Sequence, residues 1–256
     1  MKIISKIEKK AEKIKRIFIN LVIKGSKYHL GGSLSSLDLI TTIIYGNFIK
    51  MNKDSLKNFI LSKGHALGLL HAIMIEKKII KSQSLLNLKQ DGKIGGQLDI
   101  YNFKSDYFEW NSGSLGHSIG VAIGMSIAEK NKKILTLIGD AEIDEGSVWE
   151  GLFYISDKKI NNIIVIIDRN NISASSIIEK KKNLDLNLLK KLDINVKEID
   201  GHNIGQIYKT FKKIYNSKKS VILVANTIKG KGIQEIENNV KYSHHLPEMN
   251  ILKKYI

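Results

Sequence analysis

Two short apolar runs in the middle of the chain, residues 134–138 and 163–167, constrain the fold most. Both consist mainly of isoleucine, leucine and valine and both end in turn-forming residues, which is typical of buried parallel strands. The segment between them carries apolar Val148, Leu152 and Ile155 at helical spacing, which predicts a helix. A strand, a helix and a second strand in this order form the repeating unit of a parallel α/β sheet.

The same alternation of helices and strands continues along the whole chain. Helical periodicity predicts further helices at residues 3–24 and 66–76, and one from 112–116 to about 130. It also predicts a helix that begins at about residue 37 and another that ends at about residue 215. β-Branched runs predict further strands at residues 59–61, 196–199 and 221–225. The segment 25–35 is interpreted as a loop, with Ser35 or Ser36 capping the helix that follows. Residues 1–256 are therefore expected to form a single α/β domain, with a mostly parallel sheet flanked by helices.

The composition excludes several classes of protein. The chain of 256 residues contains no cysteine, so disulfides, thiolate chemistry and cysteine metal sites are excluded. The first 20 residues are charged and helically periodic, and they lack the apolar centre of a secretory signal. No apolar run approaches the roughly 20 residues needed to cross a bilayer. We therefore expect a cytoplasmic protein without a membrane partner.

The net charge of +16 raises the question of nucleic-acid binding. Of the 41 basic residues only Arg16 and Arg169 are arginine, and the lysines are spread along the whole chain. A nucleic-acid surface more often shows clustered arginine and lysine with interleaved aromatic residues. We therefore favour solvated lysines and expect no nucleic-acid partner. The positive charge still favours anionic small substrates.

Oxygen-bearing side chains follow both central strands. Asp140 comes shortly after the first run, and Asn170 comes shortly after the second. Because the carboxyl ends of parallel strands lie at one edge of the sheet, we expect these two side chains to lie close together. A carboxylate, an amide oxygen and a nearby carbonyl suit Mg²⁺, which completes its coordination with phosphate oxygens and water. Asp140 alone would more simply cap a helix, but its pairing with Asn170 favours a metal and diphosphate site.

Several motifs, in family order, resemble those of transketolases in their thiamine-diphosphate-binding N-terminal half. The residues GDAEIDEGSVWE from position 139, with DRNNIS from position 168, resemble the thiamine-diphosphate signature, which opens with GDG and closes with an asparagine-containing run. Further segments resemble transketolase motifs, namely YHLGGSLSSLDL from 28, FILSKGHA from 59, NSGSLGHSIG from 111, VKEIDGHN from 196 and VANTIKGKG from 224. Together these motifs span about residues 25–247, nearly the whole chain.

The resemblance implies a diphosphate-binding domain whose cofactors are thiamine diphosphate and Mg²⁺. It implies that the side chains of Asp140 and Asn170 and the carbonyl of Ile172 coordinate the metal. It also implies cofactor contacts from His65, Gly113, Ser114, Leu115, Gly139 and Ala141 in addition to Asp140, Asn170 and Ile172. The catalytic candidates are His29, His65, Glu145 and His244, with His245 as the alternative to His244.

Some candidate residues have simpler interpretations. Glu145 and Glu150 match carboxylates at the transketolase subunit interface, whereas the residues alone would leave both as solvated helix positions. Lys229 and Lys231 suit a phosphate contact or a flexible loop equally well. Structural or surface roles are expected for the remaining motif and helix histidines, namely His71, His117 and His202.

The chain departs from the transketolase pattern at several positions. Ala141 stands where the signature has its second glycine, which requires a negative φ at this residue. Tyr28 and Leu30 replace the glycine and proline that flank the motif histidine. Gln97 replaces a usual histidine and cannot act as an acid or base near neutral pH. Ser243 is a candidate replacement for another family histidine.

The resemblance implies transfer of a two-carbon ketol unit from a ketose phosphate to an aldose phosphate. In the family, the glutamate that activates the aminopyrimidine ring belongs to a pyrimidine-binding domain, and this chain ends at Ile256, before such a domain. We therefore expect one subunit of a split transketolase that acts with a separate C-terminal subunit, as a homodimer or an α2β2 assembly.

Two alternatives remain open. The chain is compatible with the alpha subunit of a 2-oxo-acid dehydrogenase, although the SKGHA, GGSLS and KGKG motifs speak against it. It is also compatible with a basic binding or scaffold protein that kept the fold and lost activity. The substitutions at positions 97 and 141 favour this second alternative.

Overall fold

The computed structural model describes residues 2–26, 28–82, 85, 112–173, 186–243 and 245–256. Within these residues a parallel sheet has the strand order β1-β2-β3-β5-β4. Its strands are β1 (Phe59–Leu61), β2 (Ile134–Gly139), β3 (Ile163–Arg169), β4 (Asn195–Asp200) and β5 (Val221–Asn226). The predicted α/β class is therefore confirmed, and each predicted strand forms with bounds that differ by at most two residues.

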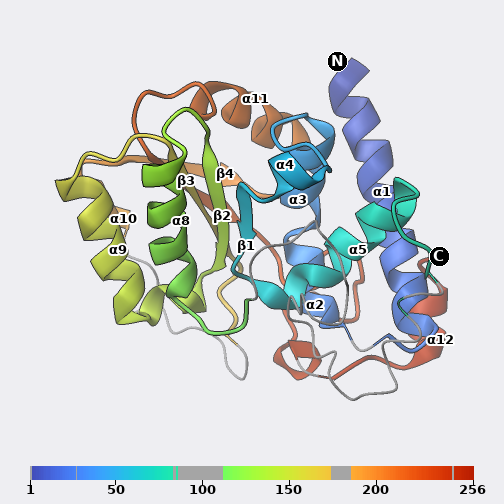
Figure 1. Cartoon of the computed structure of the whole chain (residues 1–256). Coiled ribbons are helices and arrows are strands. Elements are labelled where there is room, and N and C mark those ends of the chain that lie inside the picture. The colour runs from blue at the N-terminus through green and yellow to red at the C-terminus, as the bar shows by residue number, and fades with distance from the viewer. Residues whose placement is uncertain (1, 27, 83–84, 86–111, 174–185, 244) are drawn as a thin grey trace.

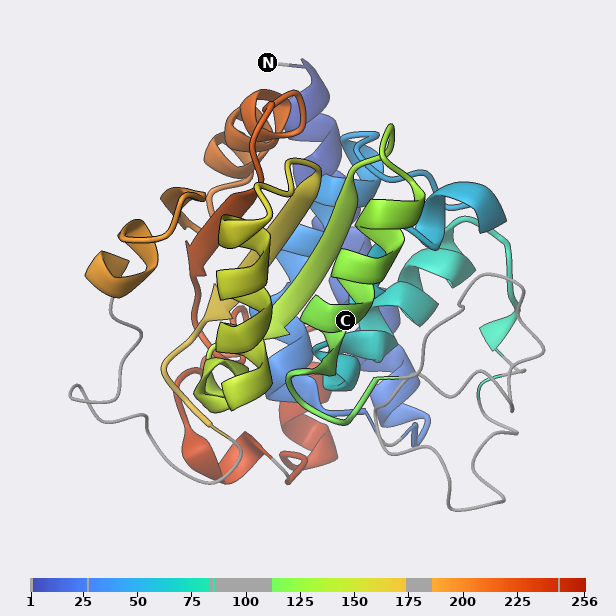
Figure 2. The same ribbon diagram turned by 60° about the vertical axis from the view of Figure 1, so that its left-hand side comes forward.

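Helices cover both faces of the sheet (Figures 1 and 2). The first layer contains α1 (Lys2–Ile23), α2 (Leu30–Ser35), α3 (Leu37–Tyr45), α5 (Leu67–Glu76), α11 (Ile204–Ile214) and α12 (Met249–Lys253). The opposite layer contains α8 (His117–Ala128), α9 (Gly146–Asp157) and α10 (Leu186–Lys190). Shorter elements are α4 (Lys53–Leu56) and the 3₁₀ turns η1 (Gly64–Ala66), η3 (Ala141–Asp144) and η5 (Val240–Ser243).

The strands are apolar at successive positions because both faces of the sheet are buried. In β2, Leu135 and Leu137 pack into the core under α1, α3 and α5, whereas Ile134 and Ile138 pack into the core under α8 and α9. Such strands show a continuous apolar run instead of an alternating one. Close packing of α9 on α8 needs Gly151, because a Cβ there would lie 2.4 Å from the Ile119 side chain.

The segment 25–35 departs from the predicted loop, because α2 occupies Leu30–Ser35. The prediction that Ser35 or Ser36 caps the following helix is also wrong. Ser36 precedes α3 but makes no side-chain cap hydrogen bond. Both hydroxyls instead donate to Asp168 of β3, at 2.7 and 2.5 Å. The sequence contains no local signal for a partner more than 130 residues away, so a local capping rule chose the wrong acceptor.

The structural role predicted for His71 is confirmed. His71 is buried in α5, and its Nδ1 lies 2.6 Å from the hydroxyl of Tyr28. Burial lowers the pKa of His71 to about 3, so the ring is neutral at physiological pH. Tyr28 and Leu30, the two substitutions beside His29, are thus core residues that hold the segment before α2 in place.

The other two structural histidines also follow the prediction. His117 is exposed at the start of α8. Nδ1 of His202 lies 2.9 Å from a carboxylate oxygen of Asp38, and Nε2 accepts a hydrogen bond from the backbone N–H of Ile228 at 2.8 Å. His202 therefore connects α3 with the segment that follows β5.

Within the described residues, no helix is both long enough and apolar enough to cross a membrane. Helix α1 has 22 residues, but it carries lysines along its length and buries only one side, including Ile7, Ile14 and Phe18. The cytoplasmic location stays a prediction.

Candidate functional site

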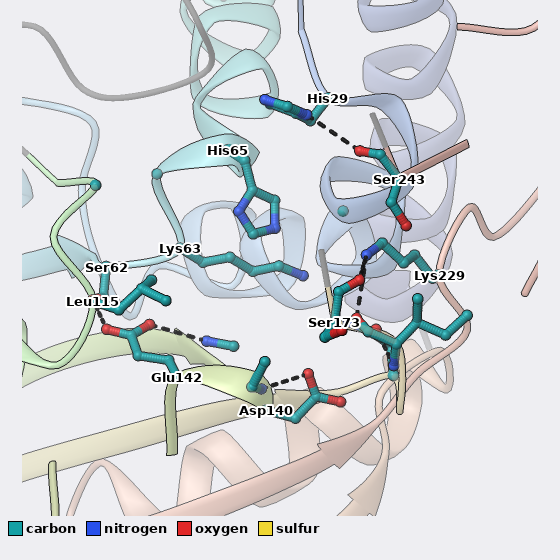
Figure 3. Close-up of a pocket in the computed structure, with 17 residues that line it drawn as sticks. His29, Ser62, Lys63, His65, Leu115, Asp140, Glu142, Ser173, Lys229 and Ser243 are labelled. Atoms are coloured by element: carbon teal, nitrogen blue, oxygen red, sulfur yellow. Dashed lines mark hydrogen bonds between the residues drawn. The ribbon is translucent and has the colours of Figure 1, made fainter. Parts of the chain in front are cut away.

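A cavity of about 430 Å³ lies at the carboxyl edge of the sheet, where β1, β2 and β3 end (Figure 3). Its volume is within the range of small-molecule sites. The segments that follow these strands meet the start of α2, the loop before α8 and the segment after β5. The lining residues include most of the predicted site, namely His29, His65, Gly113, Leu115, Gly139, Asp140, Ala141, Asn170, Ile172, Lys229 and Ser243.

The three predicted metal ligands meet at the end of β2 and β3. One carboxylate oxygen of Asp140 accepts from the N–H of Ala141 at 2.9 Å, and the other accepts from the N–H of Asn171 at 2.5 Å. The side-chain oxygen of Asn170 accepts from the N–H of Ile172 at 3.1 Å. These hydrogen bonds join the two strand ends and orient both side chains at the cavity wall.

The chemistry of this donor set fits Mg²⁺ and a diphosphate. A carboxylate, an amide oxygen and a carbonyl are hard donors, and Mg²⁺ usually takes one or two protein carboxylates together with phosphate oxygens. Among the described residues, no three His, Cys, Asp or Glu side chains form a metal-binding group of their own. A Cβ at Gly139 would meet no atom within 4 Å, so the backbone there is open to a bulky group. The residues therefore fit a metal ion whose remaining coordination positions are filled by phosphate oxygens of a bound molecule.

The departure at Ala141 is compatible with the site. Ala141 is not among the non-glycine residues with positive φ, so the condition set by the sequence is met. Gly113 and Gly116, in the loop before α8, do have positive φ values of 128° and 83°. Ser114 is exposed in this loop beside the lining residues Gly113 and Leu115.

Glu142 is a site residue that the sequence reasoning missed. It is buried in η3 and lines the cavity. Its carboxylate accepts hydrogen bonds from the Ser62 hydroxyl and from the N–H groups of Gly116 and Gly139, the latter two at 3.0 and 3.3 Å. Burial raises the pKa of Glu142 although these donors oppose the shift. Glu142 therefore connects three cavity segments, a role that no local pattern in GDAEIDEG indicates.

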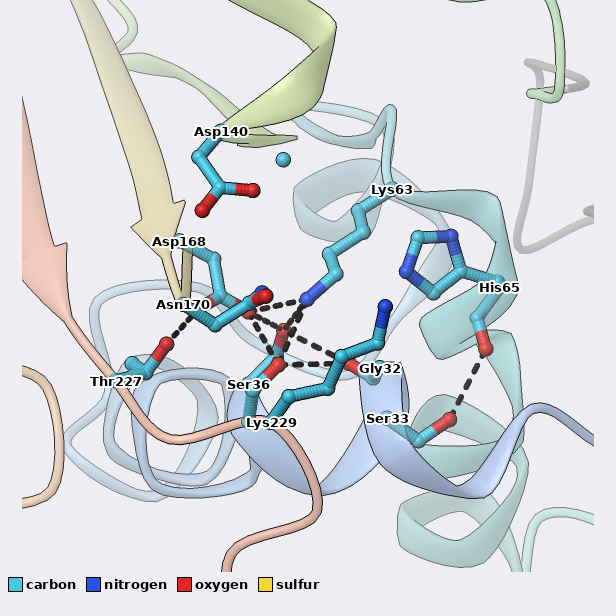
Figure 4. Close-up of polar contacts among 12 residues, drawn as sticks. Gly32, Ser33, Ser36, Lys63, His65, Asp140, Asp168, Asn170, Thr227 and Lys229 are labelled. Carbon is cyan, nitrogen blue, oxygen red and sulfur yellow. Dashed lines mark hydrogen bonds and ion pairs between the residues drawn. The ribbon is translucent and has the colours of Figure 1, made fainter. Parts of the chain in front are cut away.

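A buried ion pair lies beneath the metal ligands and was also missed (Figure 4). The ammonium of Lys63 and the carboxylate of Asp168 are in direct contact, with side-chain exposures of 2% and 0%. Asp168 also accepts from the hydroxyl of Thr227, at the end of β5, as well as from Ser35 and Ser36. Burial alone would raise the pKa of Asp168, but Lys63 and the hydroxyl donors hold it below its usual value.

This cluster defines the floor of the site. It joins the segment after β1, the ends of β3 and β5, and the start of α3, so the elements that carry His65, Asn170 and Lys229 share one set of polar contacts. The charge of Asp168 also reaches Asp140, whose pKa is raised by burial first and by Asp168 second. The sequence signal for this cluster was Asp168 at the end of an isoleucine-rich run, but its pairing with Lys63 could not be predicted from the sequence.

His65 lies close to α2 and borders the cavity. A Cβ at Gly32 would lie 2.3 Å from the ring of His65, so only glycine permits this approach. The backbone carbonyl of His65 accepts from the Ser33 hydroxyl at 3.0 Å. Burial, followed by the charges of Lys63, His29 and Lys229, keeps the pKa of His65 well below its usual value. At neutral pH this ring is therefore an uncharged hydrogen-bonding group.

His29 and Lys229 complete the wall opposite Asp140 (Figure 3). Nδ1 of His29 donates to the carbonyl of Ser243 at 3.3 Å. The ammonium of Lys229 donates to the carbonyls of Ile172 and Ser173 at 3.2 and 2.9 Å. Burial, followed by the charge of Lys63, lowers the pKa of Lys229 to about 8. Of the two roles left open for Lys229, the cavity position favours the phosphate contact. Lys231 does not line the cavity, and its Nζ lies 3.6 Å from Oε1 of Glu237.

Some predicted residues lie elsewhere. Glu145 and Glu150 are exposed on the η3–α9 segment and do not line the cavity. Their exposure is compatible with the predicted role at a subunit interface. His244 and Gln97 lie outside the described residues, so their predicted roles stay predictions. His245 is exposed. The cavity position in this segment belongs to Ser243.

Comparisons with known proteins agree with this geometry. The family described as 1-deoxy-D-xylulose-5-phosphate synthase matches residues 3–191, more than half of the chain. The A subunit of apulose-4-phosphate transketolase from Phocaeicola vulgatus is 31% identical over 254 residues, covering 94% of this chain and 89% of that protein. The chain belongs to the N-terminal family shared by 1-deoxy-D-xylulose-5-phosphate synthase and transketolase. This membership confirms the predicted resemblance and the enzyme class, transketolase.

Other members of the transketolase family are longer than this chain. Human transketolase is 31% identical over 188 residues, covering 70% of this chain and 29% of that protein. The solved transketolase of Campylobacter jejuni superposes with a TM-score of 0.85 at 24% identity, covering 100% of this chain and 42% of that one. The structural similarity confirms the fold, and the chain spans less than half the length of these two transketolases.

Proposed function

We propose that this chain is the diphosphate-binding subunit of a split transketolase, forming one such domain over residues 1–256. Together with a separate C-terminal subunit, thiamine diphosphate and Mg²⁺, it transfers a two-carbon ketol unit from a ketose phosphate to an aldose phosphate. The observation that carries the proposal is the cavity at the carboxyl edge of the sheet. There the oxygen donors of Asp140, Asn170 and Ile172 lie in one cavity with His29 and His65.

The residues of the chain have separate tasks in this proposal. Asp140, Asn170 and the carbonyl of Ile172 would hold Mg²⁺, and the loop before α8, which places Gly113 and Leu115 at the cavity, would face the diphosphate. When bound, thiamine diphosphate would supply a carbon nucleophile for the ketose carbonyl. His65 remains uncharged and supplies a hydrogen bond, because its pKa is far below neutral. Lys229 is mostly protonated at pH 7 and counters the negative charge of the phosphates.

The need for a partner subunit is supported by the outer surface of α8 and α9, which lie side by side (Figures 1 and 2). Helix α8 contains no Asp, Glu, Lys or Arg, and α9 contains two acidic residues and no Lys or Arg, in a chain of net charge +16. Ile127 and Phe153 are 51% and 55% exposed. A face that is both apolar and free of lysine is unusual on this surface and is typical of a protein contact.

We assign this α8–α9 face, defined by Gly120, Gly124, Ile127, Glu150 and Phe153, to the C-terminal subunit. The face continues to the cavity through Leu115, which precedes α8, lines the cavity and is 43% exposed. A partner seated there reaches the cofactor, which a pyrimidine-binding subunit must do. The relative from Phocaeicola vulgatus is itself named as one subunit of a transketolase.

Reconstitution tests the function. The purified chain is expected to show no ketol transfer with thiamine diphosphate, Mg²⁺, a ketose phosphate donor and an aldose phosphate acceptor. Mixing with a separate C-terminal transketolase chain is expected to restore turnover, measured by the appearance of the product ketose. The donors to compare are xylulose 5-phosphate, which is bound in a solved Pichia stipitis transketolase, and apulose 4-phosphate, for which the Phocaeicola relative is named. Robust transfer by the single chain would refute the split arrangement.

The two alternative functions predict different results in the same preparation. Decarboxylation of pyruvate by the reconstituted pair, without ketol transfer, would support a 2-oxo-acid dehydrogenase subunit. A scaffold that has lost activity would show no metal-dependent binding of thiamine diphosphate in calorimetry, even with a partner present. The oxygen donors at the cavity support binding, and the similarity to transketolases supports ketol transfer.

The proposed docking face makes a separate prediction. Phe153→Glu is expected to weaken binding of the C-terminal subunit by about 5-fold or more, because aromatic anchors contribute over about 1 kcal/mol at interfaces. The thermal unfolding of the isolated chain should not change, since Phe153 is mostly exposed. Met249→Glu, at a 39% exposed position on α12 in the opposite layer, is the matched control and should bind normally. Equal affinity of Phe153→Glu and the wild type, or self-association through this face, would contradict the assignment.

A further inference from the structure

Ser243 presents an unsatisfied hydroxyl at the cavity. In the described part of the chain, six buried side chains carry a polar atom without a hydrogen-bond partner. Among them, Ser243 is the one that lines the cavity, and the residue is 6% exposed. A buried hydroxyl without a partner is destabilising, because it has lost its hydrogen bonds to water. Such a group at a binding site indicates a partner supplied by the bound molecule.

The neighbours of Ser243 define what kind of group it can meet. Ser243 lies between His29 and Lys229, on the wall opposite Asp140 (Figure 3). Its carbonyl accepts from Nδ1 of His29 at 3.3 Å, so Nδ1 carries the proton of that ring. The unpartnered serine hydroxyl can both donate and accept a hydrogen bond. It is therefore complementary to an O–H group, which likewise donates and accepts.

The charged end of the cofactor lies elsewhere in the cavity. The metal ligands Asp140 and Asn170 are at the ends of β2 and β3, so the diphosphate is expected at that side. The ammonium of Lys63 is neutralised by Asp168, and that of Lys229 contacts the carbonyl of Ile172, itself a predicted metal ligand, and the carbonyl of Ser173. The wall formed by His29 and Ser243 therefore suits the uncharged polyol part of a bound molecule better than a phosphate.

We propose that the Ser243 hydroxyl is a specificity-determining contact that hydrogen-bonds a hydroxyl of the sugar substrate, beside His29. The proposal rests on the ketol-transfer function proposed above and adds a residue that recognises the hydroxyl groups of the sugar. Position 243 thus selects for a neutral donor–acceptor group.

The test uses the chain reconstituted with its C-terminal subunit, thiamine diphosphate and Mg²⁺. Ser243→Ala is expected to raise the KM for the ketose phosphate donor about 5- to 10-fold, the size expected for one hydrogen bond, while kcat changes less than about two-fold. Ser243→Thr keeps the hydroxyl and should restore most of the affinity. Calorimetry of thiamine diphosphate with Mg²⁺ should give the same affinity, within about two-fold, for Ser243→Ala and the wild type.

Thr41→Val is the matched control. Thr41 has a buried hydroxyl without a partner, as Ser243 does, but it lies in α3 and does not line the cavity, so its loss should leave KM unchanged. An unchanged KM in Ser243→Ala would overturn the proposal. Weaker cofactor binding at constant KM would also overturn it, by assigning the hydroxyl to the diphosphate. Failure of the proposed function gives a different result, namely no ketol transfer by the wild-type pair.

Discussion

Replacing Lys63 with methionine is expected to lower the free energy of unfolding by about 3–5 kcal/mol, because it leaves a buried carboxylate without its counter-charge. The side chain of Lys63 is 2% exposed and contacts Asp168, which is fully buried. The hydroxyl donors to Asp168 remain, but they do not supply a charge. Urea unfolding at pH 7, followed by circular dichroism, measures this loss.

Two controls separate the buried charge from lost packing. Lys219→Met breaks an ion pair with Asp193 in which both side chains are more than half exposed, and it should change the free energy of unfolding far less than Lys63→Met does. The double variant Lys63→Met/Asp168→Asn removes both charges and should recover part of the stability lost in Lys63→Met. If Lys63→Met is no less stable than Lys219→Met, the ion pair does not stabilise the site.

The pH dependence of this loss has a defined sign. In the wild type the pKa of Asp168 is held below its usual value, so the contribution of this carboxylate is present above the unfolded-state pKa and is lost as the pH falls through the folded pKa. Without Lys63, only the hydroxyl donors oppose the effect of burial, so the pKa of Asp168 should rise. Protonation then relieves the buried charge, so the stability gap between wild type and variant should narrow as the pH is lowered from about 7 to about 5.

Replacing Asp140 with asparagine is expected to weaken metal-dependent binding of thiamine diphosphate more than about 100-fold, since loss of outer-shell partners alone costs roughly 10- to 100-fold. Asparagine keeps an oxygen that can accept from Ala141 or Asn171, so the fold should survive. What is lost is the negative charge that Mg²⁺ requires. Calorimetry of the reconstituted pair, with Mg²⁺ and with EDTA, measures the effect.

Asp144→Asn is the matched control for this experiment. Asp144 lies in the same 3₁₀ turn, η3, but it is exposed and does not line the cavity. Its replacement should leave the affinity for thiamine diphosphate and Mg²⁺ unchanged. Metal-dependent binding of wild-type strength by Asp140→Asn would remove Asp140 from the set of metal ligands.

The parallel sheet could be predicted because its signal is local. The isoleucine-rich runs that form β2 and β3 are bounded by turn residues, and burial on both faces makes such runs continuous. The error at α2 has the opposite origin. The segment LGGSLS has two glycines and little helical pattern, and its helix depends on His65, Lys229 and Asp168 around it.

Part of the candidate site could also be predicted because its signal is local in the sequence. Asp140 and Asn170 follow strands, so their meeting at one edge of the sheet follows from topology. The ring of His65 and the ammonium of Lys229 come to the same cavity from segments that are far apart in the sequence. Glu142 and Lys63 were missed because their partners are distant in sequence, and neither residue type is expected to be buried.

The sequence by itself determined the α/β class, the parallel order of strand and helix, and the oxygen donors at the carboxyl edge. These follow from hydrophobic periodicity and from the positions at which strands end. Only the tertiary structure decided which polar groups are satisfied by one another. It paired Lys63 with Asp168, directed Glu142 to three cavity segments and left the hydroxyl of Ser243 unpaired at the cavity. The physical reason is that desolvation and hydrogen bonding depend on neighbours in space, whereas periodicity depends on neighbours in sequence.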